Sequence, residues 1–235
     1  KDSKVYIRAS EEADWVVIHD QKSTGQDFEA KAFSADNQML YYTLSQTTGP
    51  NALFTYNFKT GEKKQIARDD NVDPGVLLSS PVDDSVYAVR YEDGFPRYEF
   101  IDKANPFARN LIKLQASFPD ADVYPVSATN DGNKIIYVVE SDTIAGEYYL
   151  FDNTTQKAEH LVSRASWIDP AKLSLMDPMK FKARDGLDIE VFVTTPKGSS
   201  GKNLPLIVNP HGGPFGPYDS WGYNPEVQML ASRGY

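Results

Sequence analysis

The chain has 235 residues, enough for one large domain or two smaller ones, and its formal net charge at pH 7 is −9. This acidic balance argues against a nucleic-acid partner, because phosphate binding needs clustered Lys and Arg side chains. The chain has no cysteine and no apolar run near the roughly 18 residues of a membrane span, which excludes disulfides, a thiolate nucleophile, thiolate metal ligands and an apolar membrane-spanning helix.

The first residues do not have the pattern of a signal peptide, since no basic stretch followed by an apolar run opens the chain. We therefore interpret Lys1 as the end left by processing or as a boundary within a longer chain. Both a cytoplasmic location and a periplasmic or secreted one, with the signal peptide removed, agree with this composition.

Residues 1–167 repeat one local pattern, which is an apolar or aromatic strand, an Asp or Asn, a polar turn and a second strand. The pattern occupies residues 15–26, 53–66, 97–112 and 148–161. Its Asp and Asn positions follow each other at intervals of 37, 45 and 50 residues and are Asp20, Asn57, Asp102 and Asp152. Between them, an Asx-rich turn precedes an alternating strand at residues 33–43, 79–90 and 127–139. Asp, Asn and Gly accept the left-handed backbone angles of tight hairpins, so these units predict antiparallel sheets.

Four strands in each period of about 40 to 50 residues are typical of a β-propeller blade. A single antiparallel sandwich is the alternative, but the recurrence of the Asp and Asn positions in register favours blades. About four blades are visible, which is few for a closed ring, so we expect the propeller to continue before Lys1. The fold class predicted for residues 1–167 is therefore mainly β, made of propeller blades.

Two acidic segments of this region are weak candidate sites. Asp69–Gly75 is similar to a calcium-binding loop, but Pro74 stands where that loop needs Gly and Ser80 where it needs a bidentate Glu. We interpret it as an acidic turn between blades. Ser10–Asp14 holds two adjacent carboxylates that could bind a substrate ammonium group, and a solvated loop is the simpler interpretation. The two histidines of the region have no partners at ligand spacing and are interpreted as structural or exposed: His19 and His160.

The pattern changes at residues 168–178, which we interpret as a linker because two Asp-Pro steps end regular structure there. Residues 179–196 then predict two alternating strands around an Asp185–Gly186 turn. Leu204–Asn209 is almost wholly apolar, which is typical of a strand buried on both faces of an α/β sheet. A change from short antiparallel strands to such a strand indicates a second domain over residues 179–235.

A helix is predicted at the C-terminal end of this second region. Asn224 is suited to cap it, Pro225 to occupy its first position, and Gly234 to end it. Val227, Leu230 and Ala231 would form its apolar face.

The segment Asn209–Trp221 reads N-P-H-G-G-P-F-G-P-Y-D-S-W and joins the predicted strand to the predicted helix. A Gly-rich turn in this place suits either a phosphate cradle or an oxyanion hole. The chain has neither G-x-G-x-x-G nor G-x-x-x-x-G-K-[S/T], which argues against nucleotide binding. The interpretation we favour is an oxyanion hole, in which backbone N–H groups without a crowding Cβ face the oxygen of a tetrahedral intermediate.

Residues 179–235 resemble the start of the catalytic domain of the prolyl oligopeptidase family of serine peptidases, in its acylaminoacyl-peptidase and dipeptidyl-peptidase branch. The resemblance rests on R-D-G, H-G-G-P, a Trp in the following loop and L-A-x-R-G-Y. It implies a propeller that caps an α/β-hydrolase domain and admits only short peptides, with an acyl-enzyme formed by a Ser, His and Asp triad. It also implies that Gly213, in the loop with Gly212, offers the oxyanion N–H, and that His211 shapes the loop and is not the catalytic base.

The chain departs from the family in one large respect, because it contains no G-x-S-x-G nucleophile motif. Gly198–Gly201 has the wrong spacing and precedes the apolar segment. We therefore expect the whole triad beyond Tyr235, and only the first part of the α/β-hydrolase domain within this chain. The expected partners are a peptide substrate in the full-length enzyme and the rest of the catalytic domain, or a second copy of the chain; no cofactor and no metal are expected. A non-catalytic propeller that binds peptide or protein, and an esterase of the same fold, are the alternatives.

Overall fold

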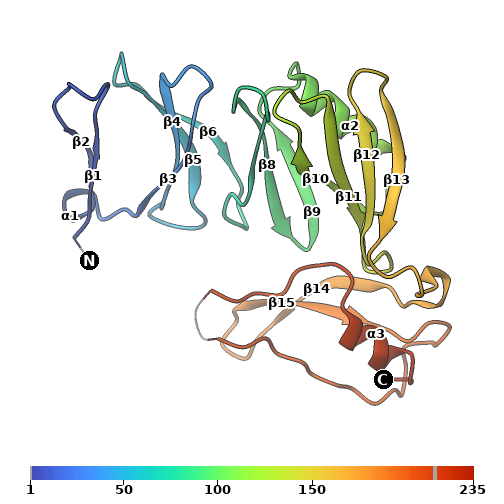
Figure 1. The fold of residues 1–235 in the computed structure, drawn as a ribbon. Coiled ribbons are helices and arrows are strands. Elements are labelled where there is room, and N and C mark those ends of the chain that lie inside the picture. The colour runs from blue at the N-terminus through green and yellow to red at the C-terminus, as the bar shows by residue number, and fades with distance from the viewer. Residues whose placement is uncertain (1, 214–215) are drawn as a thin grey trace. The chain divides into compact units, whose positions relative to one another are not determined.

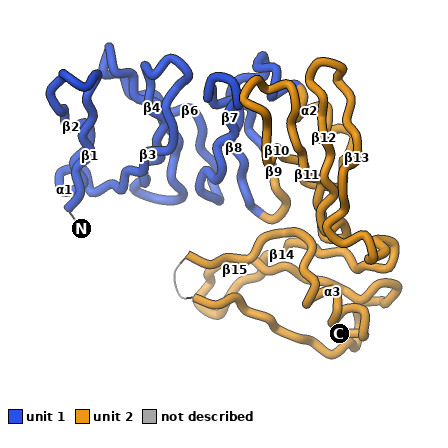
Figure 2. The backbone as a smooth tube through the Cα atoms, viewed as in Figure 1, with its two compact units in different colours: residues 1–93, 97–109 blue, residues 94–96, 110–235 orange. Residues whose placement is uncertain are grey.

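The computed structural model describes residues 2–213 and 216–235. Lys1, and Pro214 and Phe215 of the quoted Gly-rich segment, lie outside the described residues. The chain forms two compact units, which are coloured separately in Figure 2. Unit 1 consists of Lys1–Asp93 and Arg97–Arg109, and unit 2 of Gly94–Pro96 and Asn110–Tyr235.

Strands are the main element of both units, and they are labelled in Figure 1. In chain order the strands are β1 (Lys4–Ile7), β2 (Val16–Asp20), β3 (Phe28–Phe33), β4 (Met39–Leu44), β5 (Ala52–Asn57), β6 (Lys63–Arg68), β7 (Leu77–Ser79), β8 (Val86–Asp93), β9 (Phe95–Phe100), β10 (Asp122–Ala128), β11 (Lys134–Glu140), β12 (Glu147–Asp152), β13 (Lys157–Ser163), β14 (Met176–Lys182) and β15 (Asp188–Thr194). The helices are α1 (Gln21–Thr24), α2 (Pro106–Ser117), the 3-10 turn η1 (Pro170–Lys172) and α3 (Pro225–Ala231). No helix among the described residues is long and apolar enough to cross a membrane.

The sheets of the predicted blade region are antiparallel, and in each of them neighbouring strands follow one another in the sequence. Two sheets have four strands, in the orders β3-β4-β5-β6 and β10-β11-β12-β13, and β7-β8-β9 has three. The strands β1 and β2 form a two-stranded sheet. None of these sheets closes on itself within the described ranges. The prediction of a mainly β fold built from successive antiparallel sheets is confirmed.

Two of the four Asp and Asn positions lie at equivalent hairpin turns, as predicted. Asn57 is the last residue of β5 and Asp152 the last residue of β12, and each of these is the third strand of a four-stranded sheet. The side-chain Oδ1 of each accepts hydrogen bonds from the backbone N–H groups two and three residues later, at 2.8 to 3.1 Å. Lys134 also donates to Oδ2 of Asp152 at 2.5 Å, and this hydrogen bond lowers the pKa of that carboxyl to about 2.

The other two positions are followed by helices, so the prediction that this region contains strands and turns alone is wrong. Asp20 precedes α1, and Asp102 precedes α2 where the sequence pattern predicted a second strand within residues 97–112. The cap of α2 explains the error, because Asn105 Oδ1 accepts the N–H of Phe107 at 2.9 Å and Pro106 occupies the first position. The sheet β7-β8-β9 is therefore followed by a helix and has no fourth strand.

The core of unit 1 lies between two of its sheets. Tyr41 and Leu53 of β4 and β5 form one buried cluster with Val89 and Tyr91 of β8, and Leu53 and Val89 have no exposed surface. Successive sheets that pack face to face bury the alternating apolar side chains of both, which is how the blades of a propeller hold together. This packing explains why the period-2 runs are apolar on one face.

In unit 2, β14 and β15 form the predicted hairpin, with Gly186 in the turn at φ 89°. The Asp-Pro step at Pro178 lies inside β14, opposite Phe192, and not in the linker. A two-stranded sheet has only edge strands, and there a missing N–H is tolerated. The helix α3 is confirmed, since Asn224 Oδ1 accepts the N–H groups of Glu226 and Val227.

The apolar segment Leu204–Asn209 differs from its prediction as a buried strand. It forms no strand, and all of its residues except the partly buried Leu204 are exposed, with Leu206 at 85% and Val208 at 76% of their full surface. The physical reason is that the described residues supply no neighbouring strand for its N–H and C=O groups. The α/β-hydrolase part of the fold prediction therefore stays a prediction.

Candidate active site

The described residues of the Gly-rich segment, 209–213 and 216–221, form no helix or strand between Leu204–Asn209 and α3, and all of them except Trp221 are exposed. His211 and Asp219 lie on its two arms, and His211 Nδ1 is 3.0 Å from Asp219 Oδ2. This side-chain contact joins residues eight apart in the sequence and so links the two arms of the segment. The sequence analysis named His211 but did not find its partner Asp219.

The two glycines of the candidate oxyanion hole are exposed. A Cβ added to Gly212 would meet no atom of the described residues within 4 Å, and the φ of Gly212 is not left-handed. The described part of the chain therefore does not itself require glycine at this position. The oxyanion role of Gly212 and Gly213 therefore stays a prediction from the sequence.

Trp221 anchors the C-terminal arm of the loop. Its indole Nε1 donates to the carbonyl oxygen of Met176, the buried first residue of β14, at 3.0 Å. The N–H of Met176 in turn donates to Asp142 Oδ2 at 2.6 Å. Both backbone groups of Met176 are thus fixed, one by the segment between β11 and β12 and one by the loop.

Gln228 of α3 completes this buried junction. Its Oε1 accepts the N–H of Ser174 at 2.9 Å, and its Nε2 donates to the carbonyl oxygens of Ser174 at 2.8 Å and of Asp142 at 3.1 Å. All three residues are buried, with 5% or less of their surface exposed. Gln228 is not among the residues predicted from the sequence to face the core, which for α3 are Val227, Leu230 and Ala231.

We predict that Gln228→Ala lowers the free energy of unfolding by about 3 kcal/mol, because it leaves three buried backbone groups without hydrogen bonds. Urea unfolding followed by circular dichroism measures the loss. The matched control is Gln65→Ala on the exposed side of β6, which is expected to change stability by less than about 0.5 kcal/mol. Equal effects of the two substitutions would contradict the importance of the buried junction.

Three side chains on β12 and β13 have the composition of a catalytic triad without its geometry. His160 Nε2 lies 2.6 Å from Glu147 Oε2 and 3.2 Å from Ser163 Oγ, while Ser163 Oγ donates to Glu147 Oε2 at 2.5 Å. In a triad the carboxylate and the hydroxyl meet different nitrogens of the imidazole. Here both meet Nε2, so the group stabilises the hairpin and does not activate Ser163.

The other residues proposed from the sequence are held by local contacts. In the segment that is similar to a calcium loop, Asp69 accepts two backbone N–H groups and pairs with Arg97, and Asp73 accepts from Asn51. His19 is buried and lies 2.7 Å from the carbonyl oxygen of Gln26. Within residues 2–213 and 216–235, no three His, Cys, Asp or Glu side chains are placed to hold a metal ion.

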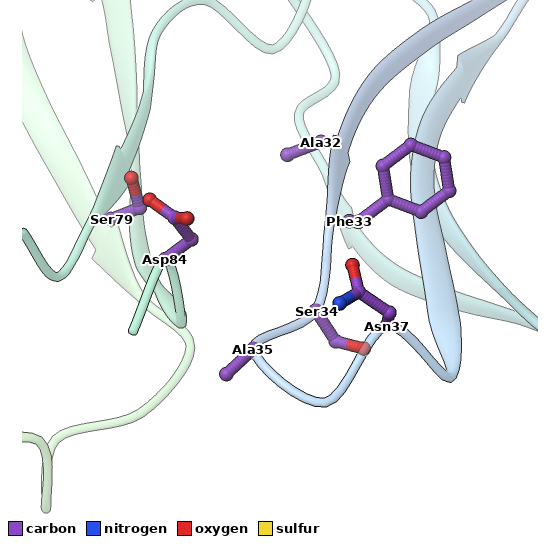
Figure 3. A pocket seen from close by; sticks show the side chains of 7 residues that line it. All are labelled: Ala32, Phe33, Ser34, Ala35, Asn37, Ser79 and Asp84. Atoms are coloured by element: carbon purple, nitrogen blue, oxygen red, sulfur yellow. The ribbon is translucent and has the colours of Figure 1, made fainter. Parts of the chain in front are cut away.

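A pocket of about 290 Å³ lies in unit 1, between the β3–β4 turn and the β7–β8 turn. Figure 3 shows Ser34 and Asn37 on one wall and Ser79 and Asp84 on the other. Asn37 and Asp84 hold the left-handed turn positions, at φ 55° and 57°. The pocket contains no histidine and no group of convergent donors, so it offers less chemistry than the Gly-rich loop.

Comparison with known proteins relates the whole arrangement to peptidases. No protein-family model matches the chain. Dipeptidyl aminopeptidase BIII of Pseudoxanthomonas mexicana is 28% identical over 207 residues, which are 85% of this chain and 30% of that protein. The chain therefore spans less than a third of the length of the curated relative that it matches.

Two solved structures resemble the chain in fold. A puromycin-hydrolyzing peptidase of Mycobacterium tuberculosis matches with a TM-score of 0.64 and 16% identity, over 99% of this chain and 37% of that chain. A prolyl endopeptidase matches with a TM-score of 0.51 and 15% identity, over 83% of this chain and 28% of that chain. At such identities the likeness concerns the fold, and it covers the successive antiparallel sheets.

Proposed function

We propose that this chain belongs to the prolyl oligopeptidase family and is part of a propeller-capped serine peptidase that hydrolyses short peptides. The observation that carries the proposal is the loop with Gly212 and Gly213, between the unpaired apolar segment Leu204–Asn209 and the capped helix α3. The relative named a dipeptidyl aminopeptidase supports the substrate class. An acylaminoacyl-peptidase is the related alternative within the same branch.

In this proposal the chain contributes one half of the oxyanion hole. The backbone N–H of Gly213 donates to the oxygen of the tetrahedral intermediate, together with the N–H that follows the nucleophile. The contact of His211 with Asp219 and the anchor at Trp221 hold the two arms of the loop. The Ser, Asp and His of the triad lie in the part of the full-length protein that follows this chain.

Labelling and hydrolysis by the full-length protein test the proposal. We expect hydrolysis of dipeptidyl anilides and stoichiometric labelling by a fluorophosphonate probe on a Ser outside residues 1–235. The polypeptide of residues 1–235 is expected to show neither reaction, because it has no nucleophile motif. Mass spectrometry locates the labelled serine.

Three results would contradict the proposal. Labelling of a serine within residues 1–235 would show that the nucleophile is misplaced. Hydrolysis of p-nitrophenyl esters without hydrolysis of any anilide would indicate an esterase. A full-length protein that neither hydrolyses nor reacts would indicate a non-catalytic propeller.

A further inference from the structure

The anchor residue Trp221 has a second partner besides Met176. Its ring meets the ring of Phe95 edge to face, with the centroids 5.3 Å apart and the planes at 70°. Phe95 is the first residue of β9, and it lies in the short segment Gly94–Pro96 that is part of unit 2. A residue from the tip of a blade hairpin thus touches the residue that ends the Gly-rich loop.

The hairpin tip approaches β14 as closely as a glycine allows. Gly94 has φ 69°, and a Cβ added to it would lie 3.0 Å from Cβ of Pro178 and 3.2 Å from its Cγ. Such contacts are shorter than ordinary van der Waals distances, so any larger residue would push the tip away. The hairpin tip that carries Phe95 therefore lies close to β14.

Phe95 is not part of the buried core. Its side chain is 53% exposed, although an aromatic residue of this size usually contributes to a core. The ring of Phe95 packs against the ring of Trp221. Its position is better explained by what it holds in place than by the surface that it buries.

We propose that Phe95 is a positioning residue for the Gly-rich loop, acting through Trp221 on the arm that leads back to Gly212 and Gly213. The inference rests on the proposed function, since the loop is taken to supply the oxyanion N–H. Trp221 donates a hydrogen bond to the Met176 carbonyl and packs against the Phe95 ring, so two contacts hold the last residue of the Gly-rich segment in place. Oxyanion donors act only at hydrogen-bond distance from the reacting oxygen, so a looser base lowers the productive fraction.

Kinetics of the full-length protein on a dipeptidyl anilide test the proposal. We expect Phe95→Ala to lower kcat about three- to tenfold with KM within about twofold, as the loss of one aromatic pair implies. Phe95→Tyr keeps the ring and is expected to stay within about twofold of wild type. Trp221→Phe removes the N–H donor, and the double substitution should cost less than the product of the two single effects, because both act on one anchor.

The matched control is Phe33→Ala, in a sheet that does not contain Phe95. The side chain of Phe33 is 52% exposed, and its ring centroid lies 5.9 Å from that of Phe58. This variant is expected to keep the wild-type kcat. Hydrogen exchange over residues 209–222 gives a readout that is independent of turnover. Phe95→Ala should accelerate exchange there at least about threefold, and Phe33→Ala should not.

The outcomes separate this inference from the proposed function. Unchanged kcat and unchanged exchange in Phe95→Ala overturn the positioning role, even if the enzyme is fully active. A fall in thermal stability with unchanged kcat and exchange also overturns it, because that is a structural role only. If the wild-type protein has no hydrolytic activity, the proposed function fails, and exchange over residues 209–222 still decides whether Phe95 orders the loop.

Discussion

Replacing Gly213 by proline in the full-length protein is expected to lower kcat about 10²- to 10³-fold, which is the usual cost of removing one oxyanion donor. Proline has no backbone N–H, so the substitution removes the proposed donor. KM is expected to change by less than about threefold, because the donor acts on charge that develops in the transition state and not in the bound substrate. Steady-state kinetics on a dipeptidyl anilide measure both constants.

The control for this substitution is Gly213→Ala, which keeps the N–H and adds only a methyl group. It is expected to retain clearly more activity than Gly213→Pro, and thermal unfolding should show both variants folded. Equal losses in the two variants would point to a steric requirement and contradict the donor role. A raised KM at wild-type kcat would place Gly213 in substrate binding.

The local features of this fold could be predicted from the sequence because local chemistry determines them. The turns at Asn57 and Asp152 follow from Asx side chains that accept nearby N–H groups, and α3 follows from Asn224 and Pro225. The helix α2 carried the same kind of signal, a capping Asn105 before a proline. It was missed because the repeat pattern was extended over it as a strand.

The contacts that hold the candidate site could not be predicted in this way. Gln228 bonds to Asp142 across 86 positions, and Trp221 bonds to Met176 across 45. Periodicity and capping describe neighbours a few residues apart, so they carry no information on such pairs. A glutamine in a helix that is half exposed gives no sign from sequence that it will be buried.

Substitutions in the apolar segment Leu204–Asn209 are expected to have opposite effects on the polypeptide of residues 1–235 and on the full-length protein. In the structure, Leu206 and Val208 are 85% and 76% exposed, and the segment forms no strand. Exposed extended backbone beside apolar side chains recruits other chains. We expect the polypeptide of residues 1–235 to self-associate through this segment, and the double substitution Leu206→Glu with Val208→Glu to return it towards a monomer. Light scattering after size exclusion measures the change.

In the full-length protein the same double substitution is expected to prevent folding. There the proposed hydrolase domain supplies the neighbouring strands, and burial of a Leu or Val side chain stabilises the fold by about 1.5 to 3 kcal/mol each. Two carboxylates in their place would be buried without partners, at a further cost of several kcal/mol. The total cost is comparable with the free energy of unfolding of a whole domain, which is roughly 5 to 15 kcal/mol. Loss of soluble, active protein on expression is therefore the expected result.

Two exposed valines of the blade region give the matched control. Val76 and Val82 are 56% and 57% exposed, and Val76→Glu with Val82→Glu is expected to leave both the association of residues 1–235 and the folding of the full-length protein unchanged. A soluble, active full-length protein with glutamate at 206 and 208 would show that the segment stays exposed in the complete enzyme. In that case the family likeness would not extend to a central strand here, and the Gly-rich loop would need another support than the sheet of an α/β-hydrolase.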